Sequence, residues 1–197
     1  MFVQIIEGTT HDADGLRRQH DLWLREVRPD AAGFLGATAG ITADGRTMNI
    51  VRFESEEQAR ANSERPEQGQ WWSETEKYFD GEVRFTESSD VEDLRGGGSD
   101  AAGFVQVMKS QGVDRGRVHA FDQALDPYLD LRPEVLGGVR VWTGPDRCVE
   151  AIYFTDEADA RAGEARERPP EVQAVFEEFG DLMEGVEFLD LPDPWLA

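Results

Sequence analysis

His20 is the side chain of this sequence best suited to acid–base chemistry. It follows Leu16 by four residues and precedes Trp23 by three, so a helix would place all three on one apolar face. An imidazole held among apolar side chains can accept a proton from a phenolic or enolic compound near neutral pH. The competing interpretation is a core histidine whose ring nitrogens are satisfied internally. We therefore name His20 as the candidate catalytic residue.

Two glutamines occupy matching places in apolar segments typical of strands. Gln4 alternates with Phe2 and Ile6, and Gln106 alternates with Phe104 and Met108. A buried amide that lacks hydrogen-bond partners costs about 1–3 kcal/mol. Gln4 and Gln106 are therefore candidate substrate-binding residues, with a contact between two sheets as the alternative.

A third group of polar residues lies on the segments expected to form central strands. Arg52 and Tyr153 occupy equivalent places, and each is a candidate substrate-binding residue. A buried arginine needs an acidic partner or an acidic substrate group. Asn49 should face the opposite side of the strand from Arg52, so at most one of these two lines a given cavity. The alternative role for Arg52 is a salt bridge at the edge of the sheet or between sheets.

An aromatic segment containing Trp71, Trp72, Tyr78 and Phe79 completes the candidate site. Trp72 and Phe79 are seven residues apart, which favours packing on a sheet, whereas Trp71 falls beside that stripe. Trp71 is thus a candidate substrate-binding residue that covers a pocket for a planar compound. Core packing with one exposed indole is the alternative.

Several other classes of site are disfavoured by the residues present. Cys148 is the single cysteine, so neither a disulfide within the chain nor a cysteine zinc cluster can form. His119 and Asp122 would supply only two ligands to a metal. The Gly96-Gly97-Gly98 run lacks the lysine of a phosphate-binding loop, and no Ser-His-Asp arrangement is evident. We expect no metal and no cofactor.

Composition narrows the range of partners. The 197 residues carry a net charge of −21, which disfavours both nucleic acid and anionic membranes. The first residues lack the basic and long apolar regions of a signal peptide, and no apolar run is long enough to span a bilayer. We expect a cytoplasmic protein whose partner is a small apolar or aromatic compound.

The chain contains an internal repeat with an offset of 101 to 103 residues. The segment at Phe2 matches that at Phe104, and Leu35-Gly36 matches Leu136-Gly137. Three further pairs follow in the same order, at Phe53 and Phe154, at Arg65-Pro66 and Arg168-Pro169, and at Val83 and Val186. We therefore expect a first module over residues 1–88, a flexible Gly-rich acidic linker over 89–101, and a second module over 102–197.

Each copy has the pattern of a βαββαβ module. In the first copy, strands are expected at 2–7, 33–42, 46–53 and 82–87, and helices at about 14–28, 55–65 and 67–79. The predicted four-stranded antiparallel sheet is apolar on both faces, so an isolated module would expose one of them. The fold prediction is an α+β protein with two modules paired as an intramolecular α/β barrel, a pseudo-dimer. Further homo-oligomerisation stays open.

This order of elements, the duplication and the Phe-x-Ser/Asp-Glu-x-x-Ala steps at Phe53–Ala59 and Phe154–Ala160 resemble the dimeric α/β-barrel superfamily. That ferredoxin-like group includes antibiotic-biosynthesis-type monooxygenases. The resemblance implies a cofactor-free monooxygenase or isomerase of a small aromatic compound. Haem degradation is disfavoured, because the expected Trp and His after the third strand are absent. The alternatives are a non-catalytic ligand-binding or stress-related barrel and a structural or oligomerisation protein, so the sequence does not decide whether the protein is an enzyme.

Overall fold

The computed structural model describes residues 1–197, which divide into two compact units. Unit 1 comprises residues 1–91 together with 193–197, and unit 2 comprises residues 92–192. Unit 1 is thus discontinuous in sequence, whereas unit 2 is continuous. None of the helices in either unit has the length and apolar character needed to cross a lipid bilayer.

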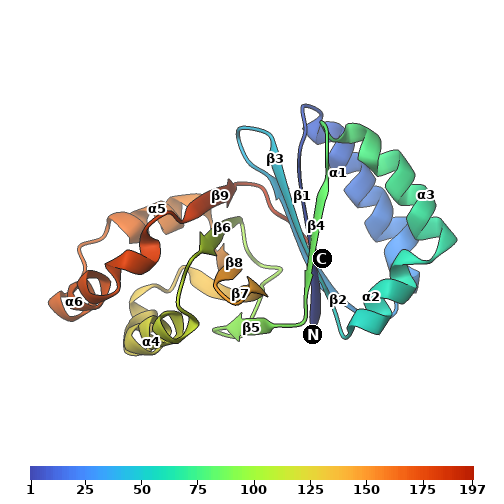
Figure 1. Ribbon diagram of the computed structural model, residues 1–197. Coiled ribbons are helices and arrows are strands. Elements are labelled where there is room, and N and C mark those ends of the chain that lie inside the picture. The colour runs from blue at the N-terminus through green and yellow to red at the C-terminus, as the bar shows by residue number, and fades with distance from the viewer. The chain divides into compact units, whose positions relative to one another are not determined.

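Unit 1 is an antiparallel sheet with its helices on one face (Figure 1). The strand order in the sheet is β10-β2-β3-β1-β4. Helix α1 continues as a π-helical turn (Trp23–Val27) and a 3-10 turn (Arg28–Asp30), and α3 continues as a 3-10 turn (Glu76–Tyr78). The main elements, in chain order, are β1 (Phe2–Thr9), α1 (Ala13–Leu22), β2 (Phe34–Ile41), β3 (Arg46–Phe53), α2 (Glu56–Ser63), α3 (Pro66–Thr75), β4 (Arg84–Ser88) and β10 (Trp195–Leu196).

Unit 2 repeats this architecture with the strand order β5-β7-β8-β6-β9. Short 3-10 segments follow its first and last helices, at Asp126–Leu131 and Gly180–Met183. Its main elements are β5 (Val91–Leu94), β6 (Phe104–Gln111), α4 (Arg115–Leu125), β7 (Val135–Gly144), β8 (Arg147–Phe154), α5 (Glu157–Ala165), α6 (Pro170–Glu178) and β9 (Glu187–Leu191).

The internal repeat accounts for this correspondence. In unit 1 the first strand pairs with the third through Phe2 opposite Phe53, and in unit 2 Phe104 lies opposite Phe154. Both pairs are buried, and each packs against the alanine of the following helix, Ala59 or Ala160. The prediction of two tandem α+β modules with antiparallel sheets is therefore confirmed.

The sheets differ from the prediction in two respects. Each is a separate, open sheet with two edge strands, so the expected closure into a barrel is wrong. Each also has five strands rather than four, because a segment outside the repeat adds to one edge. Residues 91–94, predicted as part of a flexible linker, form β5 beside β7, and residues 195–196 form β10 beside β2. The packing of one sheet face against the other stays a prediction.

A glycine in each copy leaves room for the added segment. A Cβ atom at Gly36 would lie 2.8 Å from the backbone oxygen of Ala197, and a Cβ atom at Gly137 would lie 2.2 Å from that of Gly97. Contacts this short are sterically forbidden, so a larger residue would displace the added segment. The repeated Leu-Gly pair thus has a structural reason that the sequence comparison alone did not provide.

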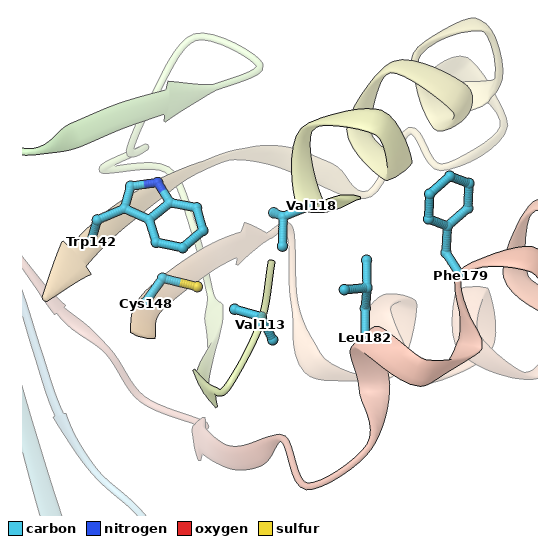
Figure 2. Packing of buried hydrophobic residues seen from close by; sticks show 6 residues of the cluster. All are labelled: Val113, Val118, Trp142, Cys148, Phe179 and Leu182. Atoms are coloured by element: carbon cyan, nitrogen blue, oxygen red, sulfur yellow. The ribbon is translucent and has the colours of Figure 1, made fainter. Parts of the chain in front are cut away.

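The core of unit 2 includes a cluster beneath the start of α4. Val113, Val118, Trp142, Cys148, Phe179 and Leu182 are all buried and approach one another from strands, helix and loop (Figure 2). Burial raises the pKa of the Cys148 thiol to about 11, so at neutral pH the side chain is a protonated, unreactive part of the core.

Candidate functional site

Unit 1 contains a cavity of about 570 Å³ between its sheet and its helices. This volume lies within the range of small-molecule sites. Residues of α1, α2, α3 and all five strands line it, and most of the lining is apolar or aromatic, including Trp23, Trp71, Trp72, Phe53 and Phe79. The polar groups among these apolar side chains therefore determine what chemistry the cavity can support.

Helix α1 places His20 in this cavity. Asp12 begins the helix by accepting a hydrogen bond from the amide of Gly15 at 2.8 Å. From that start, Leu16, His20 and Trp23 fall on the face turned toward the sheet, and all three line the cavity. The predicted position of His20 on an apolar helix face is the one that the structure shows.

Both ring nitrogens of His20 are buried without a hydrogen-bond partner. Its side chain is 12% exposed, and the nearest carboxylate oxygen, from Asp21, lies 3.8 Å from Nδ1, beyond hydrogen-bond distance. The ring packs instead against Trp195, with 5.3 Å between ring centroids. A buried imidazole without a hydrogen-bond partner is unfavourable by itself, so His20 can accept or donate a hydrogen bond that the described residues do not supply.

Burial lowers the pKa of the His20 imidazole below its usual value, and the Asp21 carboxylate offsets this only in part. The ring is therefore neutral at pH 7 and has a nitrogen lone pair available. A neutral imidazole in an apolar cavity is suited to act as a general base toward a weakly acidic ligand.

Strand β3 adds two further polar groups to the cavity. Thr47 and Asn49 point to the helix side of the sheet because side chains alternate along a strand, and both line the cavity. Thr47 Oγ1 and Asn49 Oδ1 are each buried and lack a hydrogen-bond partner. Strand alternation had predicted that Asn49 and Arg52 face opposite sides. Thr47 was missed, since a threonine in a strand is ordinary and carries no distinctive signal.

Gln4 also lines the cavity, but its amide already has a partner. Its Nε2 atom donates to Glu87 Oε1 at 2.7 Å. Trp71 is similar: its ring borders the cavity while its indole nitrogen donates to the backbone oxygen of Gln19 at 2.8 Å. Both predicted residues are thus fixed parts of the wall.

The other two candidates in central strands lie elsewhere. Arg52 pairs with Val3 in one sheet, and Tyr153 pairs with Val105 in the other. Both side chains point to the sheet face away from the helices, and neither lines the cavity of its unit. Arg52 Nε is buried without a hydrogen-bond partner, and Tyr153 is 1% exposed. Their placement follows from strand alternation, which separates them from His20 and from Gln106.

Unit 2 has a cavity of about 840 Å³ in the equivalent place, with Gln106 in its wall. Gln106 Nε2 donates to Asp190 Oδ1 at 3.0 Å, which matches the pairing of Gln4 with Glu87 in unit 1. The shared glutamine–carboxylate pair is therefore a structural element common to both copies.

The polar centre of the second cavity differs sharply from that of the first. Arg140, which is 3% exposed, donates to Asp122 at 2.6 and 3.0 Å and to Glu150 at 2.6 Å. Asp122 occupies the position of His20 in the repeat, Glu150 that of Asn49, and Arg140 that of Ala39. His20 and Asn49, which have buried polar atoms without partners in unit 1, are thus replaced in unit 2 by carboxylates that bind Arg140.

Glu92 on β5 extends this network. Its carboxylate accepts hydrogen bonds from Arg140 at 3.0 Å, Trp142 at 2.8 Å, His119 at 2.9 Å and Arg115 at 2.8 Å. Burial opposes ionisation of this carboxyl, but the hydrogen bonds from these four side chains outweigh it and lower the pKa of Glu92 to about 2. Glu92 therefore stays ionised over most of the pH range of the folded protein.

We expect Glu92→Gln to reduce the sensitivity of unit 2 to acid. The fall in pKa from 4.5 to about 2 corresponds to stabilisation on the order of 3 kcal/mol, present above pH 4.5 and lost as the pH falls toward 2. The wild type should therefore lose more stability than Glu92→Gln between pH 5 and pH 3, as measured by urea unfolding. Glu171→Gln, at an exposed position on α6, is the control and should follow the wild type. Equal acid sensitivity in all three proteins would contradict this prediction.

Comparisons with known proteins agree with the architecture. No protein-family model matches the sequence, and no curated protein is significantly similar to it. Among solved structures, a candidate monooxygenase from Lactobacillus acidophilus matches 100% of this chain and 95% of its own, with a TM-score of 0.73 and 12% identity. A candidate monooxygenase from Fusobacterium nucleatum matches 100% of this chain and 93% of its own, with a TM-score of 0.73 and 10% identity.

An anthrone oxidase-like protein also matches 100% of this chain and 92% of its own, with a TM-score of 0.67 and 12% identity. At these identities the likeness concerns the fold. The chain shares the tandem, two-module ferredoxin-like fold of these structures, so the fold that the sequence resemblance implied is confirmed.

Proposed function

We propose that unit 1 binds a planar, mostly apolar small molecule with an acidic O–H or C–H group and oxidises it as a cofactor-independent monooxygenase. The observation that carries this proposal is the pair of buried, unpartnered nitrogens of His20 inside an aromatic cavity. A ligand proton donor would satisfy the imidazole, and the indole rings would stack on the flat faces of the ligand. The likeness in fold to proteins described as monooxygenases is consistent with this chemistry.

The proposed reaction uses the polar groups of the cavity as follows. One ring nitrogen of His20 removes a proton from a CH₂ group activated by neighbouring aromatic rings, and a carbanion stabilised by those rings forms. The carbanion passes its electrons to O₂ and forms a C–O bond, giving a hydroperoxide once the imidazolium returns the proton. Loss of water then leaves a carbonyl group, so that R₂CH₂ and O₂ become R₂C=O and H₂O. Asn49 and Thr47 lie where an amide or hydroxyl could hold the oxygen atoms of the substrate.

The direct test is to incubate the protein with hydroxylated polycyclic compounds, anthrone and naphthols among them, under air and under ¹⁸O₂. We expect saturable quenching of tryptophan fluorescence and consumption of one O₂ per substrate. The product should carry one ¹⁸O atom. Absence of binding for the whole series would reject the proposed substrate class, and binding without O₂ consumption would reject oxygenation.

Non-catalytic ligand binding is the second candidate function, and unit 2 favours it. Arg140, Asp122 and Glu150 satisfy one another, so this cavity offers no free base at the position of His20. An apolar compound could still occupy it. In the experiment above, a second equivalent of bound ligand that survives replacement of His20 would support this role for unit 2.

A further inference from the structure

The segment that completes the sheet of unit 1 comes from residues 193–197, which follow the whole of unit 2 in the sequence. Strand β10 pairs with β2, with Trp195 opposite Ala39 and Leu196 opposite Thr38. Ala37 and Ala197 exchange two backbone hydrogen bonds, at 2.7 and 3.1 Å. The segment is therefore attached to the sheet at a defined register and does not lie loosely on the surface.

This register directs the side chain of Trp195 into the cavity. Trp195 lies on the same face of the sheet as Ala39, its partner in β2, which is the face covered by the helices. There it lines the cavity beside His20. The two rings lie 5.3 Å apart between centroids, at an angle of 47°. Neither His20 nitrogen has a hydrogen-bond partner, and the imidazole packs against the indole instead.

Helix α1 holds the segment from the other side. The Arg17 guanidinium lies over the Trp195 ring at 5.2 Å, and its Nη1 atom contacts Asp193 Oδ2 at 3.3 Å. Arg17 also lies 3.5 Å from Asp21, in the same turn as His20. The segment is thus bound at three points: the strand pairing, the cation–π contact and the ion pair.

We propose that Trp195 is a positioning residue of the unit 1 site, which covers His20, excludes water from it and forms one wall of the cavity for the flat ligand. This inference rests on the proposed function for its consequence in catalysis, but the covering of His20 is a property of the free protein. Unit 2 differs at the corresponding edge, because β5 brings Glu92 to Arg140 there instead of an aromatic ring to a free base. Trp195 therefore contributes to the difference between the two cavities.

Removal of the indole has a defined physical effect on His20. Water would reach the imidazole, the cost of charging the ring would fall, and its pKa would rise toward the usual value of about 6.5. With the higher pKa, the imidazole would be protonated, and so unable to accept a proton, over more of the pH range. The stacking wall for the ligand would be lost as well.

The experiment compares Trp195→Ala, Trp195→Phe and Leu196→Ala in the full chain. Leu196 lies on the same strand, but strand alternation turns its side chain to the opposite face, so Leu196→Ala controls for loosening of β10. The His20 pKa is measured by NMR titration of the ring protons without ligand. We expect a clear upward shift for Trp195→Ala, a smaller one for Trp195→Phe and none for Leu196→Ala.

The same variants then test the role in binding and turnover. With a compound identified as a substrate, Trp195→Ala should weaken binding on the order of tenfold and move the acid limb of the kcat/KM profile to higher pH. Trp195→Phe should retain most of the wild-type affinity and most of the wild-type pH profile. An unchanged His20 pKa in Trp195→Ala, or equal shifts in Trp195→Ala and Leu196→Ala, would overturn the inference. Because the titration needs no ligand, failure of the proposed function would appear separately, as absence of binding by the wild type. If Trp195→Ala fails to fold, the contrast between Trp195→Phe and Leu196→Ala still decides the matter.

Discussion

Arg140→Met should destabilise unit 2 by about 3–5 kcal/mol. Arg140 is the cation shared by Asp122, Glu150 and Glu92, at distances of 2.6 to 3.0 Å. Methionine would fill much of the same volume but would leave these carboxylates close together without their common counter-charge. Removal of one member of a buried ionic network costs far more than the network contributes, because the remaining charges stay desolvated.

Two measurements test this: urea unfolding, which gives the free energy of unfolding, and hydrogen exchange of the amides in β7 and β8. Arg147→Met is the matched control, since Arg147 lies on the neighbouring strand with its side chain 60% exposed, and it should cost less than about 1 kcal/mol. The triple variant Arg140→Met, Asp122→Asn, Glu150→Gln removes Arg140 together with two of its three carboxylates and should recover most of the loss, because Glu92 keeps its hydrogen bonds from Arg115, His119 and Trp142. If Arg140→Met were as stable as Arg147→Met, the network would not have the role described.

His20→Gln should lower kcat/KM by about 10²–10⁴-fold for a substrate that binds in unit 1, with a much smaller effect on binding. Glutamine retains polarity and approximate size but cannot take up a proton at the pH of the assay. In the wild type, the rate should rise with pH through the lowered pKa of His20, with the midpoint of the rise below the usual imidazole value of about 6.5, whereas His20→Gln should show no such rise. Steady-state kinetics between pH 4.5 and 8 would measure both effects.

Stability provides an independent check on the same residue. Because the pKa of His20 is lower in the folded protein than in the unfolded chain, the unfolded chain takes up a proton first as the pH falls below about 6.5. The wild type should lose stability in that window, and His20→Gln should lose less. His11→Gln is the control for kinetics and stability, since His11 is 84% exposed and contacts Asp80. A fully active His20→Gln would contradict the assignment of the base.

The sequence was sufficient for elements whose determinants are local. The alternation around Phe2 and Phe104 predicted β1 and β6, and the helix face containing Leu16, His20 and Trp23 predicted how α1 packs. These features depend on periodicity within a few residues, which a single sequence displays directly. The placement of His20 in an apolar cavity followed from the same reasoning.

The features that the sequence did not reveal depend on contacts between distant segments. Trp195 and Leu196 form a strand too short to have periodicity, and they pair with residues more than 150 positions earlier. The Arg140 network was visible only as three unremarkable polar residues, because its meaning comes from the register that places Arg140 opposite Glu150. The one sequence signal that could have pointed to the network is Arg140 at the repeat position of Ala39, and it was not used.

The origin of β10 also has a consequence for how the chain is made. Until residues 195–196 leave the ribosome, the outer edge of β2 has no neighbour on that side, while the rest of the first sheet has long been available. At usual rates of synthesis, the roughly 100 intervening residues correspond to a delay of about 5–20 s. An open strand edge is a point of attachment for other nascent chains, and chaperones that recognise exposed strands would act in that interval.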